Sequence, residues 1–232
     1  MMRKVAIITA RGGSKRIPKK NIKEFFGKPI ISYSIKAALE SGLFDEVMVS
    51  TDSEEIADVA RSFGASVPFL RSEENSSDFA GTEDVLGEVL KTYEKQGRAF
   101  DYFCCIYPTA PFVTPEKLKD SFAMLDASQC DGVLSVTAFS FPPQRGFVLG
   151  DNKVSPVDVE AFNMRSQDLE AIYHDCGQFY WSRVSSFKRC SQLITDSTLG
   201  YVVSEMETQD IDNTSDWEMA ELKYSYMRSK DE

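Results

Sequence analysis

Residues 6–21 read AIITARGGSKRIPKKN, an apolar strand that runs directly into a basic turn with two adjacent glycines. Gly12 and Gly13 let backbone N–H groups approach an anion with no Cβ in the way. The basic side chains around them are Arg11, Lys15, Arg16, Lys19 and Lys20. Open α/β sheets bind ligands at the carboxyl ends of their strands, so this loop predicts a triphosphate cradle. The alternative is a solvated lysine-rich loop. Neither the Walker pattern G-x-x-x-x-G-K-[ST] nor the dinucleotide pattern G-x-G-x-x-G is present.

The charge of this loop contrasts with that of the whole chain. Residues 1–30 contain nine lysines and arginines and one acid, Glu24, whereas the 232-residue chain has a formal net charge of −10. Such an acidic chain lacks the broad basic face that nucleic-acid and membrane-surface binding require, so we expect neither partner. The loop is therefore expected to bind a small anion.

Length and composition predict a single domain over residues 1–232. The chain is 42 % hydrophobic and 27 % charged, as is typical of soluble globular domains. It has no apolar run of about 18 residues and its start leads straight into strand sequence, so we expect no transmembrane helix, no signal peptide and a cytoplasmic location. The five cysteines form no C-x-x-C pair, which disfavours a disulfide framework or a zinc site.

Strand-like and helix-like segments alternate from the start of the chain. This pattern predicts an α/β fold with a mostly parallel sheet and helices on both faces. We expect strands at 5–9, 46–50, 67–70, 102–106 and 132–136. Helices are expected at 31–41, at 53–63, around 86–93, and after Thr114, an N-cap that is followed by Pro115 at the first helical position.

The alternation breaks over about 138–176, where Pro142-Pro143 and the turn Gly150-Asp151-Asn152 predict a β-hairpin excursion. We expect this excursion to cover a substrate or another subunit. Strands are expected again at 178–182 and 201–204. A capping box formed by Ser215 and Glu218 is then expected to begin the final helix.

Two acids lie between the last predicted strand and the last predicted helix. In extended backbone, Asp210 and Asp212 place both carboxylates on the same side, with Ile211 pointing into the protein. Such a pair suits Mg²⁺, which commonly takes one or two carboxylates together with substrate phosphates. The alternative is that the acids cap the helix that follows. The phosphate loop elsewhere in the chain favours the metal.

Other segments allow more than one interpretation. Asp52 or Ser53 is expected to cap the second helix. Thr82 either caps the third helix or belongs to a segment that meets a base or ribose. Residues 107–111 follow a strand in the ligand crevice, or form a purely structural turn. The single histidine, His174, is expected to pack or to contact substrate, and it excludes a multi-histidine metal site.

Five segments in order resemble the acylneuraminate cytidylyltransferases, the CMP-sialic acid synthetase family. They are residues 10–21, Val49-Ser50-Thr51-Asp52, Pro68-Phe69-Leu70-Arg71, Pro108-Thr109-Ala110-Pro111 and Asp210-Ile211-Asp212. The likeness covers nearly the whole chain. It implies a Rossmann-like nucleotidyltransferase fold in a single domain, Mg²⁺ dependence, and a homodimer in which the excursion at 138–176 reaches over the neighbouring subunit.

One branch of this family is more similar than the others. Tyr107 stands where the sialic acid enzymes commonly have a glutamine that helps to hold the sugar. Residues 107–112 and 173–181 instead look like the pseudaminic acid branch, in which a variant of the second segment with alanine in place of Cys176 is typical. The resemblance implies transfer of CMP from CTP to the anomeric hydroxyl of a nonulosonic acid, most closely pseudaminic acid, with release of pyrophosphate.

Several alternatives remain open at this point. Enzymes for sialic, legionaminic or 3-deoxy-manno-octulosonic acid share the same chemistry. A nucleotide-binding regulator without catalysis is disfavoured by the retention of both the basic loop and the Asp-x-Asp pair. A sugar-1-phosphate nucleotidyltransferase would normally show a G-x-G-x-R-[ML] loop, which is missing.

The resemblance also implies a role for individual residues. Arg11 and Lys20 are the implied catalytic residues, which stabilise the triphosphate and the leaving pyrophosphate, and Asp210 and Asp212 are the implied Mg²⁺ ligands. The implied nucleotide-binding residues are Arg11, Gly12, Gly13, Ser14, Lys15, Lys20, Asn21, Arg71, Ala80 and Thr82. The implied sugar-binding residues are Tyr107, Arg165, Gln167, Gln178 and Tyr180. Arg165 is assigned to the sugar carboxylate because a guanidinium offers bidentate donors.

Overall fold

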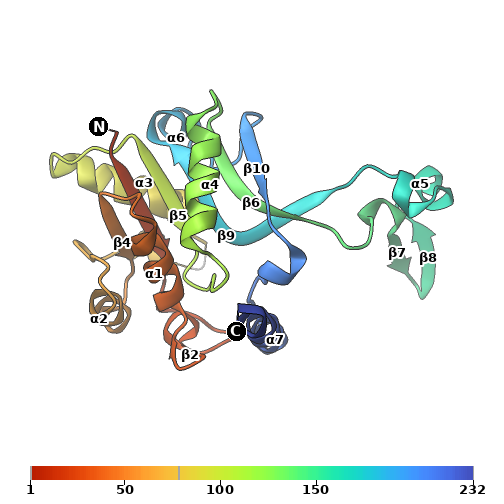
Figure 1. Cartoon of the computed structure of the whole chain (residues 1–232), viewed down its shortest axis with the longest axis horizontal. Coiled ribbons are helices and arrows are strands. Elements are labelled where there is room, and N and C mark those ends of the chain that lie inside the picture. The colour runs from red at the N-terminus through yellow and green to blue at the C-terminus, as the bar shows by residue number, and fades with distance from the viewer. Residues whose placement is uncertain (1, 78, 232) are drawn as a thin grey trace.

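The computed structural model describes residues 2–77 and 79–231. Its centre is a six-stranded sheet in the order β10-β6-β9-β5-β1-β4 (Figure 1). The strands are β1 Lys4–Thr9, β4 Glu46–Ser50, β5 Tyr102–Ile106, β6 Gly132–Ala138, β9 Tyr173–Arg183 and β10 Thr198–Val202. Neighbouring strands are parallel except at β9, which runs antiparallel to β5 and to β6. The predicted α/β fold with a mostly parallel sheet is confirmed.

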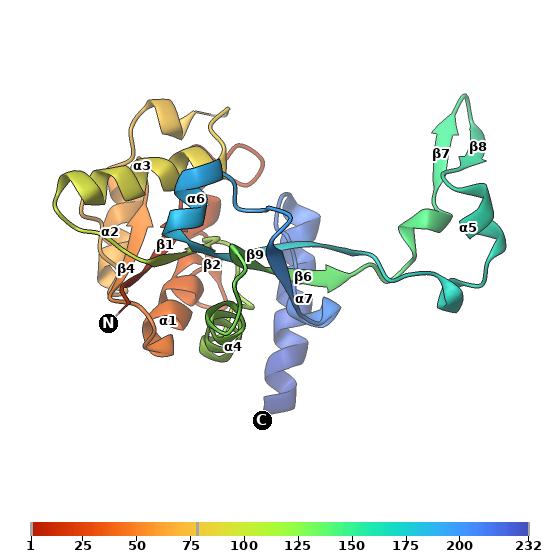
Figure 2. The same cartoon turned by 90° about the horizontal axis from the view of Figure 1, so that it is seen from above.

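Helices cover both faces of this sheet (Figure 2). They are α1 Ile31–Ser41, α2 Glu54–Ser62, α3 Thr82–Lys95, α4 Pro115–Asp126 and α6 Val184–Cys190, with α7 Thr214–Asp231 at the end of the chain. Strand β1 shows how the faces divide, because Ala6 and Ile8 pack with α1, α2 and α4 whereas Val5 and Ile7 pack with α3 and α6. A strand that is covered on both faces reads as a continuous apolar run. Within the described ranges, the structure contains no helix with the length and apolar character needed to span a bilayer.

The excursion leaves the body as an arm (Figure 1). Strands β7 Phe147–Gly150 and β8 Lys153–Pro156 form an antiparallel hairpin, and the short helix α5 Val159–Asn163 follows. At the turn, Asp151 and Asn152 have φ values of 49° and 59°, as a two-residue hairpin loop of type I′ requires. The predicted hairpin is confirmed.

Two strand predictions need correction. Residues 67–70 are not a strand, and this region contributes one isolated bridge between Met48 and Ser66. Pro68 has no N–H for a ladder, and the Arg71 N–H instead donates to the Thr51 carbonyl at 2.8 Å. The last strand lies at Thr198–Val202 rather than at 201–204.

The capping of the final helix also differs from the prediction. Asn213, not Ser215, supplies the cap, since its Oδ1 accepts a hydrogen bond from the Asp216 N–H at 3.1 Å. In return, Asp216 Oδ2 accepts a hydrogen bond from the Asn213 N–H at 3.0 Å. The reciprocal pair is a capping box that begins two residues earlier than the Ser-x-x-Glu pattern indicated.

A small apolar cluster joins the two ends of the chain. Its buried members are Ile17, Phe25, Ile30, Phe112, Ile211, Trp217 and Ala220. The Phe25 ring lies edge-on to Trp217 and Tyr224, with centroids 5.6 and 5.2 Å away. Because Ile17 belongs to the basic loop and Ile211 separates the two acids, this cluster brings the predicted phosphate and metal segments together.

Candidate active site

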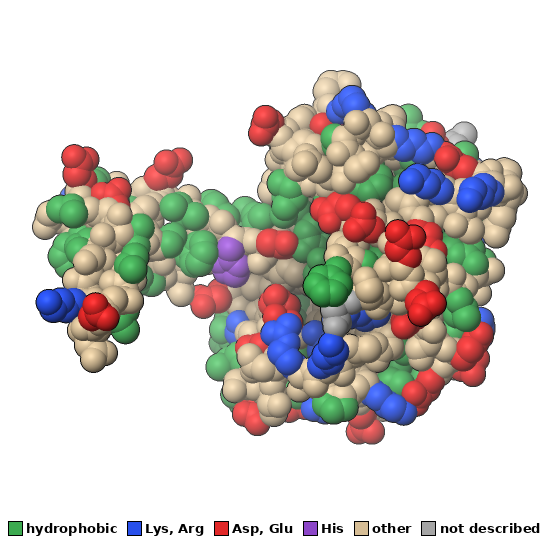
Figure 3. Space-filling model, turned by 180° about the vertical axis from the view of Figure 1, so that it is seen from behind, with side chains coloured by type: hydrophobic (Ala, Val, Ile, Leu, Met, Phe, Trp, Pro, Cys, Tyr) green, Lys and Arg blue, Asp and Glu red, His purple; other side chains and the backbone are tan. Residues whose placement is uncertain are grey.

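A cleft of about 530 Å³ opens at the carboxyl ends of β1 and β5. Ten of the predicted site residues line it: Arg11, Ser14, Lys15, Lys20, Asn21, Arg71, Ala80, Thr82, Tyr107 and Asp212. Figure 3 shows lysine and arginine side chains gathered at a hollow in the body of the molecule. The structure therefore brings most of the predicted phosphate and nucleoside residues to one place, where open α/β sheets bind their ligands.

The basic loop is anchored on the start of α2. The Gly12 N–H donates to Asp52 Oδ1 at 2.7 Å. A Cβ on Gly12 would lie 3.1 Å from the Cβ of Ser53, so a side chain here would crowd the start of α2. Of the two expected caps, Ser53 is the one that caps α2. The role of Asp52 was missed, because an acid before a helix reads as a cap, whereas here it holds the loop.

Further contacts set the path of this loop. Asn21, which is 6 % exposed, donates from Nδ2 to the Arg11 carbonyl at 2.8 Å. Lys19 points away from the cleft and pairs with Glu55 on α2 at 2.6 Å. Gly13 has open space beside its Cα. The loop thus presents Arg11, Lys15 and Lys20 to the cleft and directs Lys19 elsewhere.

The acidic segment meets the loop at Lys20. Its Nζ donates to the Ile211 carbonyl at 2.5 Å and lies 3.8 Å from Asp212 Oδ1. Arg16 pairs with the same Asp212 oxygen at 3.0 Å. Asp210 lies beside Gly177, whose positive φ of 61° allows the backbone to turn there. Asp210 is not among the residues that line the cleft, although Asp212 is.

The pKa values of Lys20 and Asp210 are both shifted in this segment. Burial lowers the pKa of Lys20, while the charges of Asp212 and Asp210 oppose that change. Burial raises the pKa of Asp210, and the neighbouring charge of Asp212 raises it further. Two neighbouring carboxylates, of which Asp210 is disfavoured in its ionised form, form a donor set that fits a divalent cation. Within residues 2–77 and 79–231, no group of three or more His, Cys, Asp or Glu side chains could hold a metal ion.

Among the residues predicted to meet the nucleoside, Arg71 is held firmly against β4. It is 8 % exposed and donates to the Ser50 hydroxyl and carbonyl at 3.1 and 2.6 Å. Burial lowers its pKa, and the charges of Asp52 and Glu88 oppose that change. Thr82 is the first residue of α3 rather than its cap, because Gly81 is the N-cap. Its hydroxyl is thereby free of a capping role and faces the cleft.

A chain of hydroxyl groups leads from the nucleoside side toward the acids. The Thr82 and Tyr107 hydroxyls lie 3.4 Å apart, and the Tyr107 and Tyr180 ring centroids are separated by 5.3 Å. The Tyr180 hydroxyl donates to Asp175 Oδ2 at 2.5 Å. Burial, together with Tyr107 and Asp175, raises the pKa of Tyr180. Asp175 was not among the predicted site residues.

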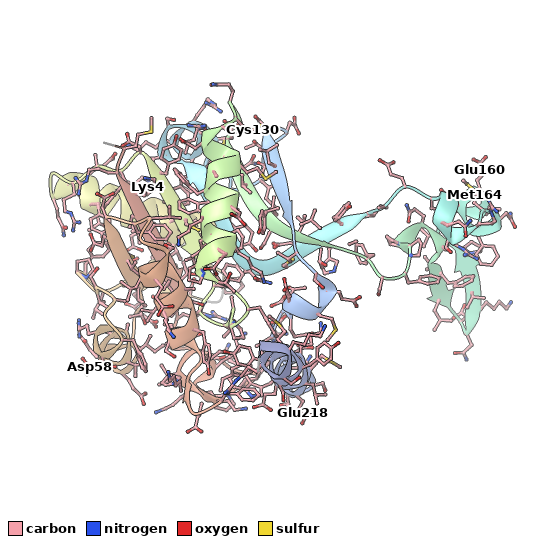
Figure 4. All side chains as sticks on the ribbon, in the orientation of Figure 1. Lys4, Asp58, Cys130, Glu160, Met164 and Glu218 are labelled. Atoms are coloured by element: carbon pink, nitrogen blue, oxygen red, sulfur yellow. The ribbon has the colours of Figure 1, made fainter. Side chains whose placement is uncertain are left out.

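Three predicted sugar-binding residues lie apart from this cleft within one chain. Gln178 is 1 % exposed, and its Nε2 donates to the Glu207 carbonyl at 2.8 Å. Arg165 lies on the arm and forms a bidentate pair with Asp168 at 2.7 and 3.1 Å. Gln167 belongs to a short 3-10 turn beside it. Figure 4 shows Met164, the residue before Arg165, at the far end of the arm.

Buried polar contacts hold the acidic segment in place. Lys117, which is 8 % exposed, donates to the Phe112 carbonyl at 2.9 Å and pairs with Glu207 at 3.1 Å. Lys223 on α7 donates to the Thr208 carbonyl at 2.8 Å. These lysines were not singled out from the sequence, because neither lies in a motif.

Comparison with known proteins agrees with this geometry. The sequence model of the family described as "Cytidylyltransferase" matches residues 5–209. The chain belongs to the cytidylyltransferase family. Pseudaminic acid cytidylyltransferase of Campylobacter jejuni (serotype O:2) is 39 % identical over 96 % of this chain and 97 % of its own length. CMP-N,N'-diacetyllegionaminic acid synthase of Legionella pneumophila is 34 % identical over 95 % of each chain.

A solved cytidylyltransferase structure shows the same fold. CMP:2-keto-3-deoxy-manno-octonic acid synthetase complexed with CTP superposes with a TM-score of 0.70 at 18 % identity, covering 97 % of this chain and 99 % of that one. At this identity the likeness is one of fold. The predicted nucleotidyltransferase architecture and the predicted family are both confirmed.

Proposed function

We propose that this cytidylyltransferase transfers CMP from CTP to the anomeric hydroxyl of a nonulosonic acid, with pseudaminic acid as the acceptor. The observation that carries the proposal is the meeting of Lys20 with the segment Asp210-Ile211-Asp212 at the edge of one cleft. The full-length relatives that act on pseudaminic and diacetyllegionaminic acid support the same chemistry.

In this reaction the basic loop neutralises the triphosphate. The anomeric oxygen forms a bond to the α-phosphorus while the bond from that phosphorus to the bridging β-phosphate oxygen breaks. The hydroxyl proton and pyrophosphate are the other products. Such a transfer requires positioning and charge neutralisation more than covalent chemistry. Arg11 and Lys20 act as preorganised cations, and Gly12, Gly13, Ser14, Lys15 and Asn21 shape the phosphate loop around them.

We assign the Asp210 and Asp212 carboxylates to Mg²⁺. When bound, the ion would supply positive charge next to the phosphates and offset the burial and the Asp212 charge that raise the pKa of Asp210. One or two carboxylates plus phosphate oxygens are usual ligands for this ion. Arg16 and Lys20 pair with Asp212 at 3.0 and 3.8 Å.

The nucleoside and sugar are assigned to opposite parts of the cleft. Arg71, Ala80 and Thr82 are proposed to meet cytosine and ribose. Tyr107 separates that side from the sugar, and its ring packs on Tyr180. Gln178 is proposed to act on the sugar only if a side-chain rearrangement frees it, since its amide is buried against residue 207.

We propose that the protein is a homodimer in which the arm contacts the second copy. The hairpin exposes apolar side chains, of which Leu149 and Val154 are 69 % and 62 % exposed. Such a surface calls for a partner. A second copy whose arm crosses to this cleft would bring Arg165 and Gln167 to a sugar that they do not reach within one chain. We place the enzyme in the cytoplasm, with CTP as the donor.

The proposal is tested by pyrophosphate release from CTP and Mg²⁺ with pseudaminic, N-acetylneuraminic, diacetyllegionaminic and 3-deoxy-manno-octulosonic acids in parallel. We expect one pyrophosphate per CMP-sugar formed and the highest kcat/KM with pseudaminic acid. Faster turnover of another acid would overturn the acceptor assignment. Absence of pyrophosphate with all four acids would overturn the reaction itself.

A further inference from the structure

The nucleoside side of the cleft includes a loop with little apolar support. In residues 72–77, every side chain is exposed or partly exposed. Even so, Asn75 and Ser77 line the cleft, and the Ser77 carbonyl accepts a 3.5 Å hydrogen bond from Arg11. Segments with few buried apolar contacts are the least stable parts of a fold. The conformation of this loop therefore depends on its polar contacts.

One carboxylate of the neighbouring helix supplies three of those contacts. Glu88 lies on α3 behind the loop, and its Oε1 accepts a hydrogen bond from the Ser72 N–H at 2.9 Å. Its Oε2 accepts from the Ser72 hydroxyl at 3.0 Å and from Asn75 Nδ2 at 2.6 Å. Both oxygens of one side chain are thus used to hold the beginning and the middle of the same short loop.

The charge of Glu88 reaches the cleft in a second way. It is among the charges that oppose the lowering of the Arg71 pKa by burial. Arg71 precedes the loop and lines the cleft, whereas Glu88 is not among the lining residues. Glu88 therefore lies one layer behind the nucleoside side, in contact with the residues that form it.

We propose that Glu88 is a positioning residue for the nucleotide: it holds residues 72–77 so that Asn75 and Ser77 face the nucleoside of CTP. This inference rests on the proposed function. Glu88 does not line the cleft, and the acidic segment and Lys20 belong to a different part of the cleft from residues 72–77. Replacing Glu88 should therefore weaken nucleotide binding rather than slow the transfer step. Replacing a residue that supported only the fold would not change CTP binding separately from the rate of transfer.

The test measures CTP binding by calorimetry and steady-state kinetics on the full-length chain. For Glu88→Ala we expect Kd and KM for CTP to rise about tenfold, with kcat at saturating CTP within about twofold of wild type. Glu88→Gln keeps one acceptor but loses the charge, so its Kd and KM for CTP are expected to lie between those of wild type and of Glu88→Ala. Hydrogen exchange of residues 72–77 should become faster in Glu88→Ala.

The matched control is Glu94→Ala on the same helix. Glu94 pairs with Lys188 on α6, away from the loop, and we expect CTP binding to stay within about twofold. If Glu88→Ala does not fold, Ser72→Ala removes one partner of the carboxylate and is expected to weaken CTP binding about threefold.

The outcomes separate this inference from the proposed function. If wild type binds CTP and releases pyrophosphate but Glu88→Ala binds CTP as tightly, the role of Glu88 is overturned and the function stands. A fall in kcat of Glu88→Ala without a change in its Kd for CTP would also overturn the proposed role of Glu88. If wild type neither binds CTP nor releases pyrophosphate, the proposed function fails, and the inference fails with it.

Discussion

Lys20 Nζ donates a 2.5 Å hydrogen bond to the carbonyl of Ile211, a residue 191 positions further along the chain. Ile211 is fully buried in the same apolar cluster as Ile17, so the contact is supported by packing on both sides. The basic loop and the two acids are therefore held together before any ligand arrives. Preorganised charge of this kind costs no rearrangement during the reaction.

Replacing Lys20 tests the value of that arrangement. Lys20→Ala is expected to reduce kcat by a factor of about 10² or more, because one preorganised cation is lost from the phosphate side. Pyrophosphate release at saturating CTP measures the effect. Lys19→Ala is the control, since Lys19 pairs with Glu55 outside the cleft, and we expect less than a threefold change. Equal effects of the two substitutions would contradict the assignment.

Asp210 should destabilise the metal-free protein at neutral pH. Its pKa is raised in the folded state, so folding binds a proton between the unfolded and folded pKa values, and stability falls as the pH rises through that window. Asp210→Asn should increase the melting temperature in chelator by a few degrees and abolish the stabilisation by added Mg²⁺. Asp58→Asn, an exposed acid on α2, should leave the response to Mg²⁺ intact. A normal Mg²⁺ response in Asp210→Asn would contradict the metal assignment.

Replacing two glycines with alanine is expected to change the stability of the protein in opposite directions. A Cβ on Gly132 would lie 2.5 Å from the Trp181 carbonyl oxygen, whereas nothing lies within 4 Å of one on Gly87. Gly132→Ala should therefore cost about 2 kcal/mol or more, because β6 and β9 must separate. Gly87→Ala, within α3, should add about 0.5–1 kcal/mol. Urea unfolding gives both values, and a neutral Gly132→Ala would show that the strands can shift freely.

Arg183 is expected to matter for stability and not for the chemistry. Its guanidinium donates to the carbonyl of Leu125, in the last turn of α4, and to those of Ser128 and Cys130, which follow this helix, at 3.0, 2.8 and 2.9 Å. Arg183→Ala should cost about 2 kcal/mol in urea unfolding. Arg189→Ala, whose side chain is 65 % exposed, should cost less than about 1 kcal/mol. A smaller loss of unfolding free energy in Arg183→Ala than in Arg189→Ala would contradict this structural role of Arg183.

Much of the body could be predicted because local patterns and packing agree. Helix α1 and strands β4 and β5 match the predicted bounds, since their apolar spacing is the same spacing that the sheet buries. The strand at 67–70 was wrong because its apolar residues suggested a ladder that Pro68 cannot complete. The cap of α7 was wrong by two residues because Asn213 competes with Ser215 for the same role.

The parts of the site that lie in charged motifs could be predicted from the sequence. Residues that hold other site residues in place could not. The loop and the Asp-x-Asp pair stood out by composition, but Asp52, Glu88 and Lys117 act through contacts between segments distant in sequence. Gln178 was assigned to the sugar by resemblance, yet in the fold its amide holds the segment beside the acids. Arg165 lies on the arm and pairs with Asp168, so its assignment to the sugar depends on the proposed second copy.

The central claim is that the basic loop and the Asp-x-Asp pair bind one triphosphate between them. A crystal structure of the full chain with CTP and Mg²⁺ tests it most directly. We predict phosphate oxygens on Arg11 and Lys20, with the metal on Asp210 and Asp212. A nucleotide bound elsewhere, or a metal that contacts neither acid, would contradict the account.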